Sequence, residues 1–217
     1  MSPAAPPARS PRGSRNRTTA LVLVSAVLGL MYSFFYHAAA INAWLPGTQV
    51  ADPELFWVTL VSDAVLGILA LCLVPAAIRH DDEELEEDTY IGPPSALVAG
   101  LVVITVWQVA PLAIAAGAVV IISISSRISA SWTIPAVCAS LFSALIAELA
   151  FFHSSVGIDW VVVGAVAAAT VILVLFGTVR GYHLRSLFRE REAAEQTPSA
   201  DHGPQAEPPQ ASADSSR

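Results

Sequence analysis

Long apolar segments alternate with short polar ones along most of this 217-residue chain. A helix of about 20 apolar residues crosses the roughly 30 Å hydrocarbon core of a bilayer. The pattern predicts transmembrane helices at residues 19–41, 55–78, 95–109, 112–126, 132–152 and 160–179. We therefore expect an all-α, polytopic transmembrane helix bundle of about six spans within residues 18–179.

Two of these spans come from one continuous apolar segment, residues 95–126. A single helix over those 32 residues would be about 48 Å long, which is far more than the membrane core requires. Pro111 lies near the middle, and proline removes a helical hydrogen bond and tends to end or kink a helix. Two short helices that turn near Pro111 are therefore the favoured interpretation, and one kinked helix is the alternative.

The arginines orient the chain in the membrane. All eleven basic residues are arginine, and with six spans they all fall on one side, in segments 1–18, 79–94, 127–131 and 180–217. Basic loops stay in the cytoplasm, so we expect both termini there and the bundle in a bacterial cell membrane. Five spans would place the arginine-rich C-terminal segment outside, which the same bias disfavours.

The tryptophans agree with this orientation, because the indole ring prefers the membrane–water interface. The tryptophans at expected outer ends of spans are Trp44, Trp57, Trp107 and Trp160, and Trp132 is at an expected inner end. The position of Trp107 therefore supports an outer turn near Pro111.

Composition separates the membrane region from the ends of the chain. The chain is 54% hydrophobic and only 13% charged, with a mean hydropathy of +0.60, whereas soluble domains are about 25% charged. Segments rich in proline and polar residues predict disordered tails at 1–17 and 196–217, and a juxtamembrane helix is expected at 180–195. The use of arginine without lysine, with abundant alanine, valine and glycine, suggests a high-GC, actinobacterial genome.

The first apolar segment also resembles a secretory signal peptide. Basic residues precede it, and Ala38-Ala39-Ala40 offers a cleavage site of the A-x-A kind. However, the segment is longer than the usual apolar region of about 7–15 residues, and it ends in aromatic residues. We therefore expect an uncleaved helix.

Candidate metal and cofactor sites are not evident in the sequence. The acidic run Asp81–Asp88 lacks the alternating spacing of a calcium loop, so we interpret it as a solvated loop. Cys72 and Cys138 lie in apolar segments without histidine partners, which predicts no metal site. We expect no cofactor, and no nucleic-acid partner.

Four ionisable residues within or beside the expected spans form a candidate intramembrane polar site: Asp63, Glu148, His153 and His37. A carboxylate near the bilayer centre costs about 2.5–3.5 kcal/mol on insertion scales, so Asp63 should face the bundle interior. It would be protonated there, or hydrogen-bonded to Ser, Thr or His. The other three residues lie near outer ends and would form a polar pocket with it, or simply reach interfacial water.

The C-terminal end of the membrane region resembles a known family. Residues 175–185 read LFGTVRGYHLR and residues 186–195 read SLFREREAAE. This is similar to the exit from the membrane region of actinobacterial sensor histidine kinases of two-component systems. The segment WQVAPLA (107–113) resembles their proline-interrupted apolar stretch, although family members carry arginines where this chain has Trp107, Gln108 and Val109.

The resemblance implies a sensor-type membrane module without its kinase. No segment matches the family's histidine-bearing phosphoacceptor box or its ATP-binding boxes, and 38 residues follow the last expected span. Catalytic motifs such as GxGxxG, the P-loop, HExxH and GxSxG are also missing from the sequence. We therefore expect a protein that is not an enzyme.

Three functions stay open at this point. The first is a non-catalytic sensor-like protein whose helix after Arg180 contacts a second copy or a cytoplasmic signalling partner. Leu184, Leu187 and Phe188 form an apolar stripe at helical spacing suited to such pairing. The second is a small transporter or transport-system subunit with Asp63 and Glu148 along a polar path. The third is a purely structural or assembly role in the bilayer.

Overall fold

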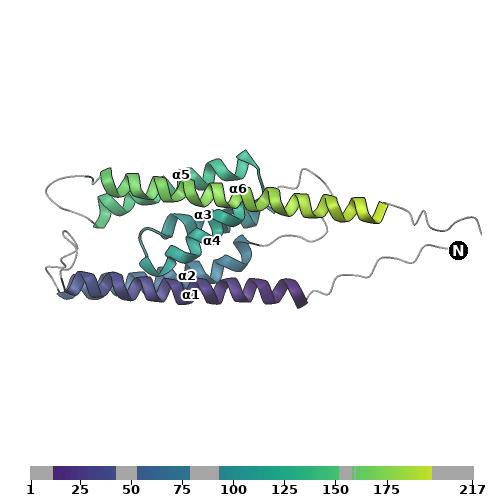
Figure 1. Cartoon of the computed structure of the whole chain (residues 1–217). Coiled ribbons are helices and arrows are strands. Elements are labelled where there is room, and N and C mark those ends of the chain that lie inside the picture. The colour runs from purple at the N-terminus through teal and green to yellow at the C-terminus, as the bar shows by residue number, and fades with distance from the viewer. Residues whose placement is uncertain (1–11, 43–52, 79–92, 152–157, 159, 197–217) are drawn as a thin grey trace, which may run out of the picture. The chain divides into compact units, whose positions relative to one another are not determined.

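The computed structural model describes residues 12–42, 53–78, 93–151, 158 and 160–196. Within these ranges every regular element is helical, which confirms the predicted all-α class (Figure 1). The elements are α1 (Arg12–Ile41), α2 (Pro53–Ala77), α3 (Pro94–Val106), the short 3₁₀ helix η2 (Pro111–Ala113), α4 (Ile114–Ser125), α5 (Ala130–Phe151) and α6 (Trp160–Gln196).

Four of the helices are long and apolar enough to cross a bilayer. Their apolar parts cover Asn16–Ile41, Phe56–Ala77, Ala130–Leu149 and Trp160–Leu187. Large apolar side chains on all four helices are exposed, for example Leu23, Val65, Phe142 and Ile172. Surfaces of this kind are stable in lipid and costly in water. The four helices therefore indicate a membrane protein.

The apolar segment 95–126 is divided into two helices, as its proline predicts. α3 ends at Val106 and α4 starts at Ile114, so the alternative of one kinked helix is wrong. Ala110 has an extended backbone (φ −119°, ψ 103°), because the residue before a proline is sterically biased away from the helical region.

α3 and α4 are shorter than the two spans that the sequence predicts. They have 13 and 12 residues, about 20 and 18 Å at 1.5 Å per residue, against a membrane core of roughly 30 Å. Turn residues replace the last residues of the expected helix 95–109, which shortens α3 further. Two of the six expected spans are therefore helices of less than membrane length.

α1 and α6 differ from the expected tail and span boundaries. α1 begins at Arg12, so Arg12–Arg17 belong to the helix rather than to the expected tail. α6 is one helix from Trp160 to Gln196, so the expected span and the expected juxtamembrane helix are continuous. The chain divides into two compact units after Tyr182, and the described part of the second unit is the helical segment 183–196.

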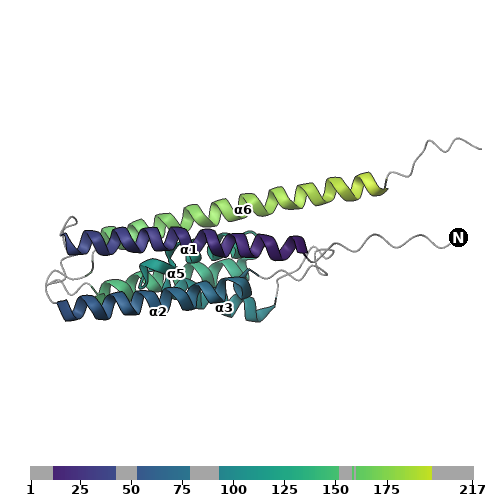
Figure 2. The same cartoon turned by 90° about the horizontal axis from the view of Figure 1, so that it is seen from below.

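The α3–η2–α4 hairpin supplies most of the buried core of the first unit. Val103 and Ile104 of α3, and Val120, Ile121 and Ile124 of α4, are 0% exposed. α3 packs against α2 and α5 (Figure 2). α4 and η2 pack against α1. The shortest apolar helices are thus enclosed by the longer ones.

Two tryptophans that the sequence assigns to the membrane interface are buried instead. Trp107 is 4% exposed at the end of α3, where it packs against Gly117 of α4. Trp132 is 3% exposed, and the guanidinium of Arg127 lies 4.1 Å from its ring centroid. Trp57 and Trp160 are exposed, as an aromatic belt requires. The position of Trp107 therefore does not mark an outer surface.

Candidate functional site

Asp63 is the most unusual residue of the apolar helices, because it is a carboxylic acid with only 2% of its surface exposed. It lies in the middle part of α2, a helix that is otherwise mostly apolar. Burial of an ionisable group without polar partners is strongly unfavourable in a membrane. The neighbours of Asp63 therefore determine whether the bundle can hold it.

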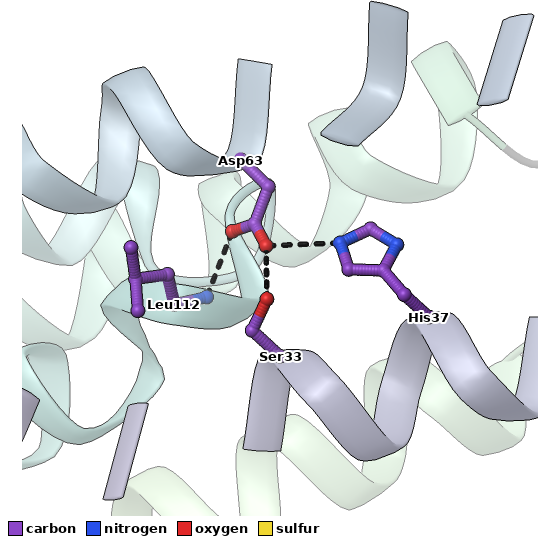
Figure 3. Close-up of polar contacts among 4 residues, drawn as sticks. All are labelled: Ser33, His37, Asp63 and Leu112. Carbon is purple, nitrogen blue, oxygen red and sulfur yellow. Dashed lines mark hydrogen bonds and ion pairs between the residues drawn. The ribbon is translucent and has the colours of Figure 1, made fainter. Parts of the chain in front are cut away.

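Three groups from two other elements surround the Asp63 carboxyl group (Figure 3). The hydroxyl of Ser33 on α1 donates to Oδ2 at 2.5 Å, and Nε2 of His37 lies 3.0 Å from the same oxygen. The backbone amide of Leu112 in η2 donates to Oδ1 at 2.8 Å. Both carboxyl oxygens therefore have partners, and one side chain joins α1, α2 and the turn of the hairpin.

Helical periodicity brings these groups to one place. Gly29, Ser33 and His37 follow one another at intervals of four residues, so they lie along one face of α1. Asp63 and Gly67 have the same spacing on α2. The facing stripes of the two helices thus combine small residues with the polar residues of the site.

The two glycines make room for Leu112 at the turn of the hairpin. A Cβ atom on Gly29 would lie 2.2 Å from the carbonyl oxygen of Leu112, and a Cβ on Gly67 would lie 2.5 Å from the Leu112 Cβ. Real carbon atoms do not approach so closely, so both positions require glycine in this packing. The tip of the hairpin is seated between α1 and α2 at the level of Asp63.

The Asp63 carboxyl group also accepts a hydrogen bond from the first turn of a helix that has no capping side chain of its own. The first amides of a helix have no partner within the helix, and a side-chain oxygen usually accepts from one of them. The residues before η2 and α4 are Ala110 and Ala113, and neither makes a side-chain capping bond. Asp63 supplies that oxygen from α2, at the end of the helix where acidic side chains are favourable.

Aromatic rings enclose the histidine of the cluster. The ring of His37, a residue only 7% exposed, meets the rings of Tyr36 and Phe56 edge to face, with centroids 5.5 and 5.9 Å away. These contacts hold the imidazole on the side of Asp63 nearer the end of α1 at Ile41. Phe56 comes from the start of α2, so the aromatic contacts again join α1 to α2.

The structure brings together part of the site that the sequence predicts. His37 and Asp63 are in direct contact, as an ion pair or a hydrogen bond depending on the histidine proton. Glu148 is 5% exposed near the end of α5, and Tyr36 lies close enough to both Asp63 and Glu148 to interact with them electrostatically. His153 lies outside the described residues.

The predicted pairing stripe on the C-terminal helix is partly described. Leu184 and Leu187 are both 41% exposed on α6. The side chain of Phe188 lies outside the described part of the structure. Two of the three stripe residues are therefore available for contact.

Sequence reasoning missed Ser33 and Leu112. A serine one helical turn before an intramembrane histidine is a signal for Ser33, since both then share a face. Leu112 carries no such signal, because its contribution is a backbone amide that every residue except proline has. Only the folded chain can place that amide against a carboxylate.

The hydrogen bonds of this cluster connect α1, α2 and η2. Within the described ranges, no group of three or more His, Cys, Asp or Glu side chains is arranged to hold a metal ion. Asp63 accepts hydrogen bonds from donors on two other elements, and loss of the acceptor would leave these donors buried without a partner.

No known protein family, curated protein or solved structure matches the chain.

Proposed function

We propose that this chain is a non-catalytic membrane signalling protein in which the Asp63 cluster and the C-terminal helix are mechanically connected through α4. The cluster consists of Ser33, His37, Asp63 and the Leu112 amide. A stimulus that changes the hydrogen bonding of the cluster would move the hairpin tip, and the hairpin would transmit this movement to α6.

The observation that carries the proposal is that the continuous segment η2–α4 has close contacts at both of its ends, at Leu112 and at Ile122 and Ser126. At its start, Leu112 is bound by Asp63 and seated against Gly29 and Gly67. At its end, Gly177 and Gly181 of α6 lie against the carbonyl oxygens of Ile122 and Ser126. Cβ atoms added to these two α6 glycines would meet those oxygens at 2.6 and 2.2 Å.

This pair of glycines has the GxxxG spacing that lets two helix backbones approach closely in a membrane. Backbone-to-backbone contact transmits displacement better than contact between flexible side chains, because the atoms cannot move independently of the helix. α6 continues from these glycines through Leu184 and Leu187 to Gln196. The likeness of residues 175–195 to the membrane exit of sensor histidine kinases supports an output at this helix.

A spin label at the C-terminal helix tests the connection. Leu187→Cys, in a background with Cys72→Ala and Cys138→Ala, is labelled and reconstituted in nanodiscs. Asp63→Ala is expected to change the mobility of the label, because the tip of the hairpin loses its acceptor. Gly164→Ala is the matched control on α6, since nothing lies within 4 Å of an added Cβ there. An unchanged spectrum with Asp63→Ala would contradict the proposal.

One observation favours transport as a second candidate function. Transporters bind substrates near the membrane midplane, at the ends of discontinuous helices. η2 lies at the turn between the short helices α3 and α4, next to Asp63. Proteoliposome flux of protons or small cations that is abolished by Asp63→Asn would support transport. No flux for a broad panel of cations would exclude this candidate, while the spin-label experiment would be unaffected.

A further inference from the structure

The depth of the hairpin tip is defined by its contact with Asp63. Asp63 lies roughly two fifths of the way along α2, about 15 Å from Pro53 at 1.5 Å per residue. The Leu112 amide binds its carboxylate, and Gly29 and Gly67 touch Leu112. The turn of the hairpin therefore lies well inside the length of α2 and not at its end.

Burial of the turn agrees with this depth. Ala110, Leu112 and Ala113 are at most 6% exposed, and Pro111 is also buried. A loop that connects two spans at a membrane surface is normally solvated, because its backbone amides and carbonyls need partners. Irregular backbone inside a membrane is tolerated only where protein encloses it. The buried turn between α3 and α4 is irregular backbone of this enclosed kind.

The open end of the hairpin lies at the other end of α2. Gly100 of α3 is close to Val120 and Ile124 of α4, where a Cβ would be 3.2 and 2.9 Å from their side chains. The same Cβ would lie 3.8 Å from the Cβ of Ala77, the last residue of α2. The middle of α3 and the second half of α4 thus lie level with the C-terminal end of α2, and the start of α3 lies a further six residues along its helix, away from the turn.

We propose that α3, η2 and α4 form a re-entrant hairpin, which enters and leaves the bilayer on one face and is latched at mid-depth by Asp63. The chain then has four spans, α1, α2, α5 and α6, and one hairpin. The segments before α3 and after α4 stay on the same face as in a six-span arrangement. The orientation that the arginines indicate is therefore kept, and only the position of the turn differs.

The latch is the hydrogen bond from the Leu112 amide to the Asp63 carboxylate. The helix that starts at the tip has no capping side chain of its own. Asp63 is the acceptor for a backbone amide that would otherwise be unpaired within the membrane. This role explains a carboxylic acid in an apolar helix without requiring an exchangeable ligand.

Single cysteines locate the turn. In the background with Cys72→Ala and Cys138→Ala, the tip carries Gln108→Cys, the end of α1 carries Asn42→Cys, and the open end carries Ser95→Cys or Ser131→Cys. Each variant is treated with a membrane-impermeant maleimide before and after the cells are permeabilised. Spin labels at the same positions report depth by power saturation with oxygen and a nickel chelate.

The re-entrant hairpin predicts that Asn42→Cys reacts from the outside, and that Ser95→Cys and Ser131→Cys react only after permeabilisation. Gln108→Cys should stay unreactive from the outside, and its spin label should report a depth within the hydrocarbon core. Reaction of Gln108→Cys from the outside as fast as Asn42→Cys, or a spin label at the depth of Asn42, would overturn the proposal in favour of six spans.

The latch has its own test in the same assay. Asp63→Ala is expected to raise the reactivity of Gln108→Cys in permeabilised cells about tenfold, the effect of losing one buried hydrogen-bond acceptor. Asp63→Asn keeps an oxygen for the Leu112 amide and should give a much smaller increase. Equal reactivity in the two variants would show that Asp63 does not hold the tip.

If the Asp63→Ala variant does not insert into the membrane, a second variant, Gly67→Ala, tests the latch. Gly67→Ala leaves Asp63 intact but places a methyl group against Leu112, so it should also raise the reactivity of Gln108→Cys. Gly164→Ala is the control and should leave that reactivity unchanged. No difference between these two glycine variants would contradict the seating of the tip between α1 and α2.

Discussion

The backbone amide of Leu112 donates a 2.8 Å hydrogen bond to the carboxylate of Asp63, although 49 residues separate them in the sequence. The bond joins the middle of a long helix to the turn of a short hairpin. Ser33 and His37 bind the other oxygen of the same carboxylate, so α1 shares the connection.

Removal of the Asp63 carboxylate should destabilise the bundle. Asp63→Ala leaves the buried Leu112 amide without its acceptor, at a cost of about 1–3 kcal/mol, and also removes the acceptor of the part-buried Ser33 hydroxyl. Asp63→Asn retains an acceptor oxygen and should cost less. Thermal unfolding in detergent, followed by the loss of the monodisperse fraction, compares the two variants. A larger loss for Asp63→Asn would contradict the importance of the Leu112 bond.

The close approach of α1 to the hairpin should make Gly29 intolerant of a side chain. Gly29→Ala places a methyl group 2.2 Å from a backbone oxygen that cannot rotate away, and overpacking of this kind costs about 1–3 kcal/mol. Gly164→Ala, with no atom near the added methyl group, should be neutral. Unfolding in mixed detergent and SDS measures both, and equal stabilities would argue against this packing.

A hydroxyl pair should hold α5 to α6 weakly. Thr170 on α6 donates to the carbonyl of Val166, so the 2.8 Å contact with Ser140 on α5 is best made with Ser140 as donor. Interhelical hydrogen bonds in membranes are worth about 0.6 kcal/mol on average. A double-mutant cycle with Ser140→Ala and Thr170→Val should give a coupling energy near that value. A coupling energy indistinguishable from zero would show that the contact does not contribute.

The exposed leucines of the C-terminal helix should mediate self-association. Leu184→Asp combined with Leu187→Asp places charges on the apolar stripe and should shift the protein from dimer to monomer. Ser186→Asp adds a charge to the same segment beside the stripe and is the control. Mass photometry in nanodiscs, or crosslinking in membranes, reads the oligomeric state. Unchanged oligomerisation in the double variant would exclude pairing through this stripe.

Part of the polar cluster could be predicted from the sequence. A carboxylate in an apolar helix must face the interior and find a hydroxyl or imidazole partner, and Asp63 does so with Ser33 and His37. The position of Trp107 could not be predicted in this way, because an indole ring suits both an interface and a core. Its burial against Gly117 depends on how α3 folds back on α4.

The sequence by itself determined the helical class, the four long apolar helices and the break at Pro111, because hydropathy and proline chemistry act locally. Only the tertiary structure decided where the turn between α3 and α4 lies along α2. Hydropathy does not encode depth, so an outer loop and a buried tip look alike in the sequence. The Leu112 amide acquires its partner only when α2 presents Asp63 beside it, and that partner is a property of the assembled bundle.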